Sequence, residues 1–250
     1  MISAYIMGGL GNMLFQVAAG FAHSLLVNDE FCISDSNMSQ MKHTSFRGYE
    51  DNIFRNVPKG SPIGVTRYDE LTFAYNSIPK YKDMILSGYF QSEKYFIEYE
   101  KEIRSLFSPP KEDIDYLGIK YGDLGMYTSL HVRRGDYINQ QAYHPTCSID
   151  YYMQAIEKIG AKDILIFSDD IAWCRSKFKG HNYTFVSGNL DYQDLYLMSM
   201  CKSNIIANSS FSWWGAWLGN NTAVVAPANW FGSSIAHSTE DLYPPSWVII

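Results

Sequence analysis

A chain of 250 residues, 46% of them apolar and 18% charged, is long enough to form one large α/β domain or two smaller ones. Its formal net charge of -6 argues against a nucleic-acid-binding surface, because proteins that bind duplexes normally carry a basic face. The four cysteines are scattered without CxxC or Cys/His spacing, so the sequence indicates neither a zinc site nor a disulfide framework.

The first half of the chain is predicted to alternate strands with helices. The expected strands are residues 2–7, 31–34 and 84–90, and the expected helices are residues 13–26 and 92–107. Ser92 is the expected N-cap of the second helix, and the pair Pro109 and Pro110 ends it. Residues 35–83 are polar and interrupted by proline and glycine, so the sequence assigns no element to them.

From about residue 125 the alternation becomes regular. The expected strands are residues 127–132, 163–168, 183–187, 204–207 and 223–226, and the expected helices lie near 148–160, 171–178, 191–202 and 211–219. This βαβ order is typical of a parallel sheet. We therefore expect an α/β fold of two halves, residues 1–115 and 116–250, joined within the stretch 108–124.

Polar segments follow the predicted strands of the second half. They are RRGD (133–136), DD (169–170), GN (188–189), NSS (208–210) and PAN (227–229). Ligands of open parallel sheets bind outside the carboxyl ends of the strands, so these segments are candidates for one binding site. A sheet edge with only a structural role would also be polar, so the pattern by itself leaves both interpretations open.

The adjacent arginines Arg133 and Arg134 are the first candidates for ligand contacts. Two neighbouring guanidinium groups repel each other, and a bound diphosphate would satisfy both because the guanidinium fork matches phosphate oxygens. The alternative is a structural network in which Asp136 and other carboxylates pair with the arginines. His131, still within the strand, fits a core histidine better than a proton carrier.

The segment that begins at Asn208 lies where a strand is expected to turn into a helix. Backbone N–H groups and hydroxyls at a helix N-terminus form an anion site, so Ser209 and Ser210 are candidate phosphate contacts. A serine that simply caps the helix gives the same pattern. Three tryptophans follow at helical spacing and are expected in the core: Trp213, Trp214 and Trp217.

The glycines of GGLGN (residues 8–12) allow a ligand to approach the backbone closely at the start of a helix. The string is neither GxxxxGK[ST] nor a full GxGxxG, so it supports neither a nucleoside-triphosphate loop nor a nicotinamide site. Gly9 and Gly11 are therefore candidate contacts to a ligand that the motif alone does not identify.

Two acidic pairs have competing interpretations. Asp169 and Asp170 are suited to accept hydrogen bonds from the N1–H and 2-amino group of guanine, but they also fit a helix N-cap with an acidic first turn. Asp113 and Asp115 form a D-x-D string, the spacing that some transferases use for a metal. Because this string follows two prolines, we expect an exposed turn rather than a metal site.

In this order, the motifs resemble those of the α-1,2-fucosyltransferases of glycosyltransferase family 11. The resemblance rests on GGLGNMLFQ, GYFQSEKYF, HVRRGDY, FSDD..WC and DLYLMSMCKSNIIANSSFSWWGAWL, and it covers almost the whole chain. It implies two Rossmann-like domains facing a cleft (GT-B type), an acceptor-side first domain and a GDP-fucose-binding second domain. It also implies inverting transfer of fucose from GDP-fucose to the 2-hydroxyl of a galactose-containing acceptor, without a metal or other cofactor.

The resemblance also assigns roles to individual residues. It implies that Arg133 meets the β-phosphate, that His131 lies against the guanine, and that Asn12 lies near the reacting sugar. The other donor-binding residues that it implies are Gly9, Gly11, Asp169, Asp170, Asn208, Ser209, Ser210 and Phe211. A related protein O-fucosyltransferase carries Arg in the middle of its GxGN turn, where this chain has Leu10, so a cation at that point must come from elsewhere.

Catalysis requires groups that stabilise the negative charge growing on the β-phosphate, and Arg133 and Arg134 are the expected cations. Arg133 is expected to matter more, because Arg134 is expected to be partly neutralised by Asp136. The sequence offers no clear general base: Asp136, Glu93 and the departing phosphate itself are the candidates.

The chain shows no secretory signal pattern and no run approaching the roughly 18 apolar residues of a membrane span. We therefore expect a cytoplasmic protein of bacterial or viral type, whereas the animal members of the family are anchored in the Golgi membrane. Three other functions stay open: a transferase for another GDP-sugar or another fucose linkage, a phosphate-ester hydrolase, and a non-catalytic carbohydrate-binding protein. The hydrolase would need an activated nucleophile or a metal cluster that is not visible, and the binding protein would not explain two arginines at a sheet edge.

Overall fold

The computed structural model describes residues 1–250 except 35, 37, 39–45, 63, 181 and 220. The chain divides into two compact units, Met1–Pro109 with His237–Pro244, and Pro110–Ala236 with Pro245–Ile250. The division falls between the two prolines, and a segment near the C-terminus returns to the first unit. A single boundary near residue 115 does not describe this return.

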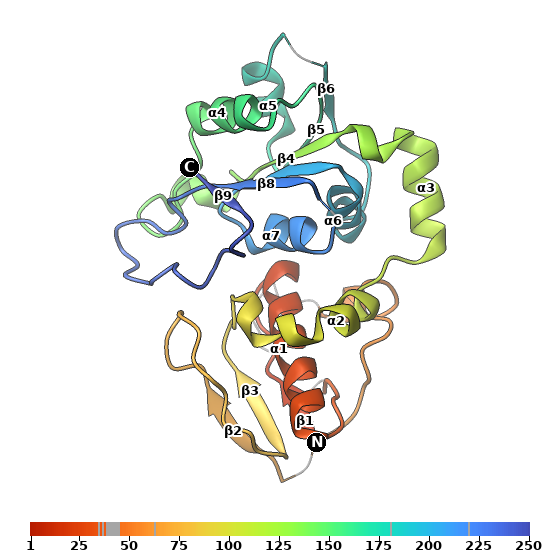
Figure 1. Ribbon diagram of the computed structural model, residues 1–250, viewed down its shortest axis with the longest axis vertical. Helices are drawn as coiled ribbons and strands as arrows, with labels where there is room; N and C mark the ends of the chain where they lie inside the picture. Colours follow the sequence, from red (N-terminus) through yellow and green to blue (C-terminus); the bar gives the residue numbers. More distant parts are fainter. Residues whose placement is uncertain (35, 37, 39–45, 63, 181, 220) are drawn as a thin grey trace. The chain divides into compact units, whose positions relative to one another are not determined.

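The first unit contains a three-stranded parallel sheet and a long helix (Figure 1). Its strands are β1 (Ile2–Ala4), β2 (Thr66–Asp69) and β3 (Met84–Ser87), in the order β1-β3-β2. Helix α1 (Leu10–Val27) follows Gly9 and ends at Asn28, which closes the last turn with a left-handed φ of 50°. The glycine turn lies between β1 and α1 in the chain, and α1 packs on β1 and β3.

The strand expected over residues 31–34 is absent. Phe31 and Ile33 instead make isolated parallel bridges, to Ile2 and Lys59 respectively, so the pairing never extends beyond single residues. Within the unassigned stretch 35–83 the structure contains a 3-10 turn, η2 (Phe46–Tyr49), and β2. Residues 35, 37, 39–45 and 63 of that stretch lie outside the described residues.

The helix expected over residues 92–107 is divided into three pieces. They are two 3-10 turns, η3 (Glu93–Tyr95) and η4 (Ile97–Tyr99), and a short helix, α2 (Glu100–Leu106). Phe96 separates the first two because its backbone, with φ -145° and ψ 0°, is not helical while its ring is buried. Ser92 caps η3 as predicted, since its hydroxyl accepts a hydrogen bond from the N–H of Lys94 (3.3 Å).

Helix α1 is long and apolar enough to cross a membrane by length and composition, contrary to the expectation from the sequence. Most of the helix is nevertheless buried within the structure, including the polar side chains of Gln16 and His23. The Gln16 amide accepts from the N–H of Met7 (3.0 Å) and donates to its carbonyl (3.2 Å). This burial is that of the core helix of a domain.

The second unit is built on a six-stranded parallel sheet in the order β6-β5-β4-β7-β8-β9. The strands are β4 (Thr128–Val132), β5 (Asp163–Ser168), β6 (Asn182–Phe185), β7 (Ser203–Ile205), β8 (Ala223–Ala226) and β9 (Val248–Ile249). The chain runs outward from β4 to β6, crosses back to β7 and runs outward to β9, which is the strand order of dinucleotide-binding α/β folds. Ligands of such sheets bind where the order reverses, at the carboxyl ends of β4 and β7.

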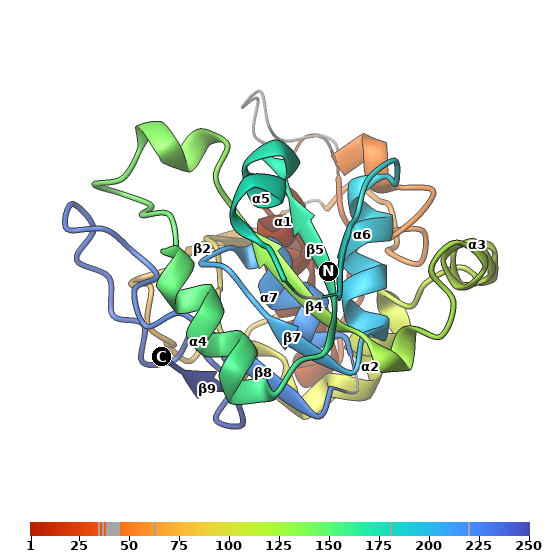
Figure 2. The same ribbon diagram turned by 90° about the horizontal axis from the view of Figure 1, so that it is seen from above.

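Helices cover both faces of this sheet. They are α4 (Ile149–Ile159), α5 (Ile171–Lys177), α6 (Asp191–Met200) and α7 (Ser210–Trp217), while α3 (Lys111–Tyr121) packs against α6. Figures 1 and 2 show α4 and α5 on one face, with α6 and α7 on the other. The rings of Trp213 and Trp214 in α7 are fully buried with centroids 5.3 Å apart, so the prediction of core packing is confirmed.

The D-x-D string does not form the exposed turn that the sequence suggested. It lies in the first turns of α3, and Asp113 is buried and accepts a hydrogen bond from the Nε2 of Gln193 (2.7 Å). A proline before the helix and acidic residues in its first turn favour this start, because carboxylates are stabilised by the N-terminal end of the helix dipole.

Candidate functional site

The carboxyl ends of β4 and β7 bring the arginine pair next to the segment that begins at Asn208. β4 ends at Val132, directly before Arg133, and pairs in parallel with β7. The hydroxyl of Tyr137 donates to the carbonyl oxygen of Asn208 (3.1 Å), which ties the turn after β4 to the turn after β7. These two segments therefore lie together in the second unit.

Arg133 is held between two carboxylates. Its Nη2 lies 2.7 Å from Asp136 Oδ1, and its Nη1 lies 3.0 Å from Asp169 Oδ2. Its guanidinium carbon also lies 5.4 Å from the ring centroid of Tyr137. The side chain keeps 36% of its surface exposed, so solvent or a ligand can reach a cation that is paired but not enclosed.

Arg134 has a different environment and a different partner. Its Nε lies 3.1 Å from Asp170 Oδ2, and its guanidinium lies 4.0 Å from the ring centroid of Trp173. Asp136 pairs with Arg133 and not with Arg134, which corrects the expectation from the sequence. The reason is local, because the 3-10 turn η6 (Asp136–Asn139) places the residue three positions after Arg133 beside its guanidinium.

The two aspartates after β5 are engaged within the protein. Asp170 caps α5 by accepting from the N–H of Trp173 (3.0 Å), and this hydrogen bond, followed by Arg134, lowers the pKa of its carboxyl. Asp169 accepts from the backbone N–H of Arg134 (2.9 Å). A Cβ at Gly135 would lie 2.5 Å from Asp169 Oδ2, so a glycine at this position allows the close approach. Asp170 is thus the N-cap of α5, as one of the two interpretations predicted. Recognition of guanine by these carboxylates stays a prediction.

His131 is buried at the carboxyl end of β4, with its ring 5.6 Å from that of Phe211. Burial, together with the nearby charge of Arg133, lowers the pKa of His131 to about 3, so the imidazole is neutral near pH 7. Its Nδ1 has no hydrogen-bond partner within the part of the chain that the structure describes. These features agree with a neutral histidine at the edge of the core rather than a proton carrier.

The side chain of Asn208 is used to hold two neighbouring loops. Its Nδ2 donates to the carbonyl oxygens of Pro145 (2.8 Å) and Trp230 (3.0 Å). Ser209 occupies the N-cap position of α7, but its hydroxyl makes no capping hydrogen bond, so the interpretation of a plain serine cap is wrong here. Ser210 is the first residue of α7, and the turn that leads into this helix follows β7, the strand paired with β4.

The glycine turn of the first unit is joined to a second motif. Gly8 has a φ of 79°, Gly9 is the N-cap of α1, and Gly11 lies in the first helical turn. Asn12 Oδ1 accepts a hydrogen bond from the Nε2 of Gln91 (2.9 Å), so GGLGN and GYFQSEKYF meet through their amides. The sequence did not single out Gln91, although it lies within one of the motifs that carry the family resemblance.

The two carboxylates considered as general bases lie in different units. Glu93 is the first residue of η3, directly after the capping Ser92, in the first unit. Asp136 lies in the second unit and forms an ion pair with Arg133. The role of either residue as a base stays a prediction.

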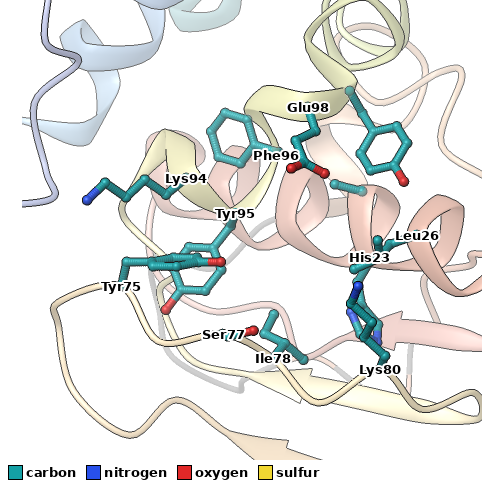
Figure 3. Close-up of a pocket in the computed structure, with 12 residues that line it drawn as sticks. His23, Leu26, Tyr75, Ser77, Ile78, Lys80, Lys94, Tyr95, Phe96 and Glu98 are labelled. Carbon is teal, nitrogen blue, oxygen red and sulfur yellow. The ribbon is translucent and has the colours of Figure 1, made fainter.

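A cavity of about 230 Å³ lies in the first unit between α1, the segment 75–80 and the turns η3 and η4 (Figure 3). Tyr75 and Tyr95 form part of its wall, with ring centroids 4.8 Å apart. Lys94, also in the wall, forms an ion pair with Asp241. The sequence did not indicate this cavity, because part of its wall comes from residues to which no element was assigned.

Among the described residues, no group of three or more His, Cys, Asp or Glu side chains is arranged to hold a metal ion. The expectation of metal-independent chemistry stays a prediction that a chelator can test.

Sequence comparisons relate the chain to known glycosyltransferases. The sequence profile of Glycosyl transferase family 11 matches residues 2–250. An α-1,2-colitosyltransferase of Escherichia coli is 32% identical, with 100% of this chain and 98% of the relative covered. A galactoside 2-α-L-fucosyltransferase of Caenorhabditis elegans is 26% identical over 99% of this chain and 78% of the relative.

A structural comparison shows the same fold in a solved enzyme. The crystal structure of the α-1,6-fucosyltransferase NodZ soaked with GDP-fucose has a TM-score of 0.57 to this chain at 13% sequence identity, covering 94% of this chain and 96% of NodZ. The expected α/β architecture with parallel sheets, of the GT-B type, is therefore confirmed.

Proposed function

Because the chain belongs to glycosyl transferase family 11, we propose that it transfers L-fucose from GDP-β-L-fucose to the 2-hydroxyl of a galactoside-type acceptor glycan. The observation that carries this proposal is the position of Arg133 and Arg134 at the carboxyl end of β4, beside β7, where sheets of this order bind nucleotides. The names of the C. elegans relative and of the NodZ complex support the linkage and the donor.

In this reaction the acceptor oxygen attacks the anomeric carbon while the bond to the β-phosphate breaks, which inverts the configuration. Arg133 and the N-terminus of α7 stabilise the negative charge that grows on the phosphate. The proton of the acceptor hydroxyl passes to a carboxylate or to the departing phosphate. The residues of the chain thus supply positioning and charge stabilisation, and no metal is required.

Donor binding requires Arg133 to exchange a carboxylate for phosphate. Its partner Asp136 is 53% exposed, whereas Asp169 is 27% exposed and is also fixed by the backbone N–H of Arg134. Ion pairs of such exposure contribute only about 0–1 kcal/mol, so the exchange costs little. Asp136 is the partner that we expect to turn away.

A colitosyl donor is the second candidate, because a relative that is 32% identical over the whole chain is named an α-1,2-colitosyltransferase. Colitose is fucose without its 3-hydroxyl, so both donors would share the GDP, the 6-methyl group and the position of the reacting carbon. The two functions therefore differ in a single hydroxyl of the donor sugar.

A donor panel tests the proposal. The purified chain is incubated with GDP-fucose, GDP-colitose or GDP-mannose and with a β-galactoside acceptor, with and without EDTA, and the linkage of the product is determined by NMR. We expect an α-1,2-linked fucosyl product that is insensitive to EDTA. Preferred transfer of colitose would identify the second candidate, and glycan binding without affinity for GDP would overturn both.

We also propose that the chain works in the cytoplasm. The similarity to a relative from E. coli and the burial of most of α1 support this localisation.

A further inference from the structure

The turn formed by residues 88–91, between β3 and η3, is held by a carboxylate from the end of a neighbouring strand. Glu70, directly after β2, accepts hydrogen bonds from the backbone N–H groups of Tyr89 (Oε2, 2.6 Å) and Phe90 (Oε1, 2.9 Å). The backbone N–H of Glu70 donates to the carbonyl oxygen of Ser87 (2.8 Å), which continues the pairing of β2 with β3. Both oxygens of the Glu70 carboxylate are therefore committed to one turn.

This turn contains a backbone conformation that needs support. Phe90 has a φ of 52°, which an aromatic residue rarely adopts, and its ring is fully buried against Tyr95 with centroids 5.2 Å apart. A Cβ at Gly88 would lie 2.3 Å from the Cβ of Glu70, so the glycine allows Glu70 to approach. Strained residues persist only where the surroundings fix them, and the Glu70 hydrogen bonds fix this one.

Gln91, the last residue of this turn, contacts the GGLGN motif of residues 8–12. Gln91 is buried, and its Nε2 donates to Asn12 Oδ1 (2.9 Å). On its other side the Asn12 amide packs against Gly8, where a Cβ would lie 2.6 Å from Asn12 Nδ2. The orientation of the Asn12 amide is thus determined by Gln91 and by the backbone at Gly8.

We propose that Glu70 is a positioning residue that sets the orientation of the Asn12 amide through the 88–91 turn and Gln91. Its effect on the reaction rests on the proposed function, in which Asn12 lies near the reacting sugar. A carboxylate suits this task because it accepts from two N–H groups at once. An amide at the same position presents one oxygen, and it leaves one of the two N–H groups without its acceptor.

Glu70→Gln is the first test. We expect kcat to fall about 10- to 100-fold, because a small displacement of a positioning group has effects of this size, while KM for the donor changes less than about twofold. Glu102→Gln, on the exposed side of α2, is the matched control and should leave both constants unchanged. Gln91→Leu, which removes the amide that donates to Asn12, should reproduce the loss of kcat.

A double-mutant cycle separates positioning from general damage to the fold. If Glu70 acts through Asn12, Glu70→Gln should lower kcat by less than about twofold when Asn12 is already alanine. Losses that multiply independently in the double variant, or a Glu70→Gln enzyme with the kcat of the unaltered chain, would overturn the proposal.

A second measurement does not depend on activity. In the ¹⁵N-labelled protein, the side-chain amide resonances of Asn12 and Gln91 should shift with Glu70→Gln but not with Glu102→Gln. Unchanged resonances would refute the link between Glu70 and Asn12. If the unaltered chain transferred no sugar from any donor, the proposed function would fail while this experiment still decided the role of Glu70.

Discussion

Arg133 and Arg134 are adjacent in the chain, but their side chains have different surroundings. Arg134 lies on the ring of Trp173 and pairs with the carboxylate that caps α5, so its side chain also supports the local structure. Arg133 is more exposed, and a phosphate can replace Asp136, the more exposed of its two carboxylate partners. At the scale of single residues, the first arginine is therefore the better candidate for the phosphate and the second is partly structural.

We expect Arg133→Ala to lower kcat by at least about 100-fold, the loss typical of removing a major transition-state donor. Arg134→Ala should lower kcat less, but it should reduce the free energy of unfolding because the contact with Trp173 is lost. Steady-state kinetics at saturating donor, combined with denaturant unfolding of both variants, measure the two effects. Near-normal turnover of Arg133→Ala would contradict the assigned role.

Asp136→Asn distinguishes two roles of the same carboxylate. If Asp136 competes with phosphate for Arg133, removal of its charge should tighten GDP binding about two- to fivefold and leave kcat within about threefold. If Asp136 is the general base, kcat should instead fall about 100-fold or more with little change in GDP affinity. We expect the first outcome. Calorimetry with GDP and initial rates decide it, with Glu93→Gln as the matched variant of the other candidate base.

At the scale of helices and strands, the sequence predicted the second unit better than the first. Buried runs of apolar residues between helices located β4 and β5 to within a residue, because both strands are covered on both faces. The two-residue β9 has no such run, and the interruption at Phe96 depends on the burial of one ring. Local patterns locate elements that are regular, but not the points where tertiary packing interrupts them.

The candidate site shows the same difference between local and distant information. The rule for parallel sheets placed the arginine pair correctly at the end of β4, and the sequence suggests Asp136 as a partner of the pair, but it does not indicate the pairing with Asp169 and Asp170. Asp169 and Asp170 follow a different strand, 35 and 36 residues from Arg134. Glu70 was missed for a related reason, since it lies in the unassigned stretch and its partners are 19 and 20 residues away.

At the scale of the whole molecule, the second crossing of the chain between the units was not predictable. Asp241 belongs to the first unit because it accepts from the N–H of Tyr75 (2.9 Å) and pairs with Lys94. These partners lie 166 and 147 residues earlier in the chain, and the sequence around Asp241 carries no sign of them. All six tryptophans, in contrast, belong to the second unit, so tryptophan fluorescence is a probe located in that unit.

Because the tryptophans lie in the second unit, their fluorescence can be used to measure how the stability of that unit depends on pH. Burial raises the pKa of Asp194 to about 6, against an ordinary value of 3.8, although Asn189 Nδ2 donates to its Oδ1 (2.8 Å). The folded state therefore binds the Asp194 proton more tightly than the unfolded chain, and this carboxyl lowers the free energy of unfolding as pH rises from about 4 to 6. The loss is complete above pH 6 and amounts to at most about 3 kcal/mol.

Asp194→Asn keeps an oxygen for Asn189 and removes the ionisation. We expect the stability of Asp194→Asn, relative to the unaltered chain, to rise between about pH 4 and pH 6 and then to stay constant. Denaturant unfolding followed by tryptophan fluorescence at several pH values measures this difference, and Asp115→Asn, on the exposed side of α3, is the control. A difference that is independent of pH would show that the buried carboxyl of Asp194 titrates as it does in water.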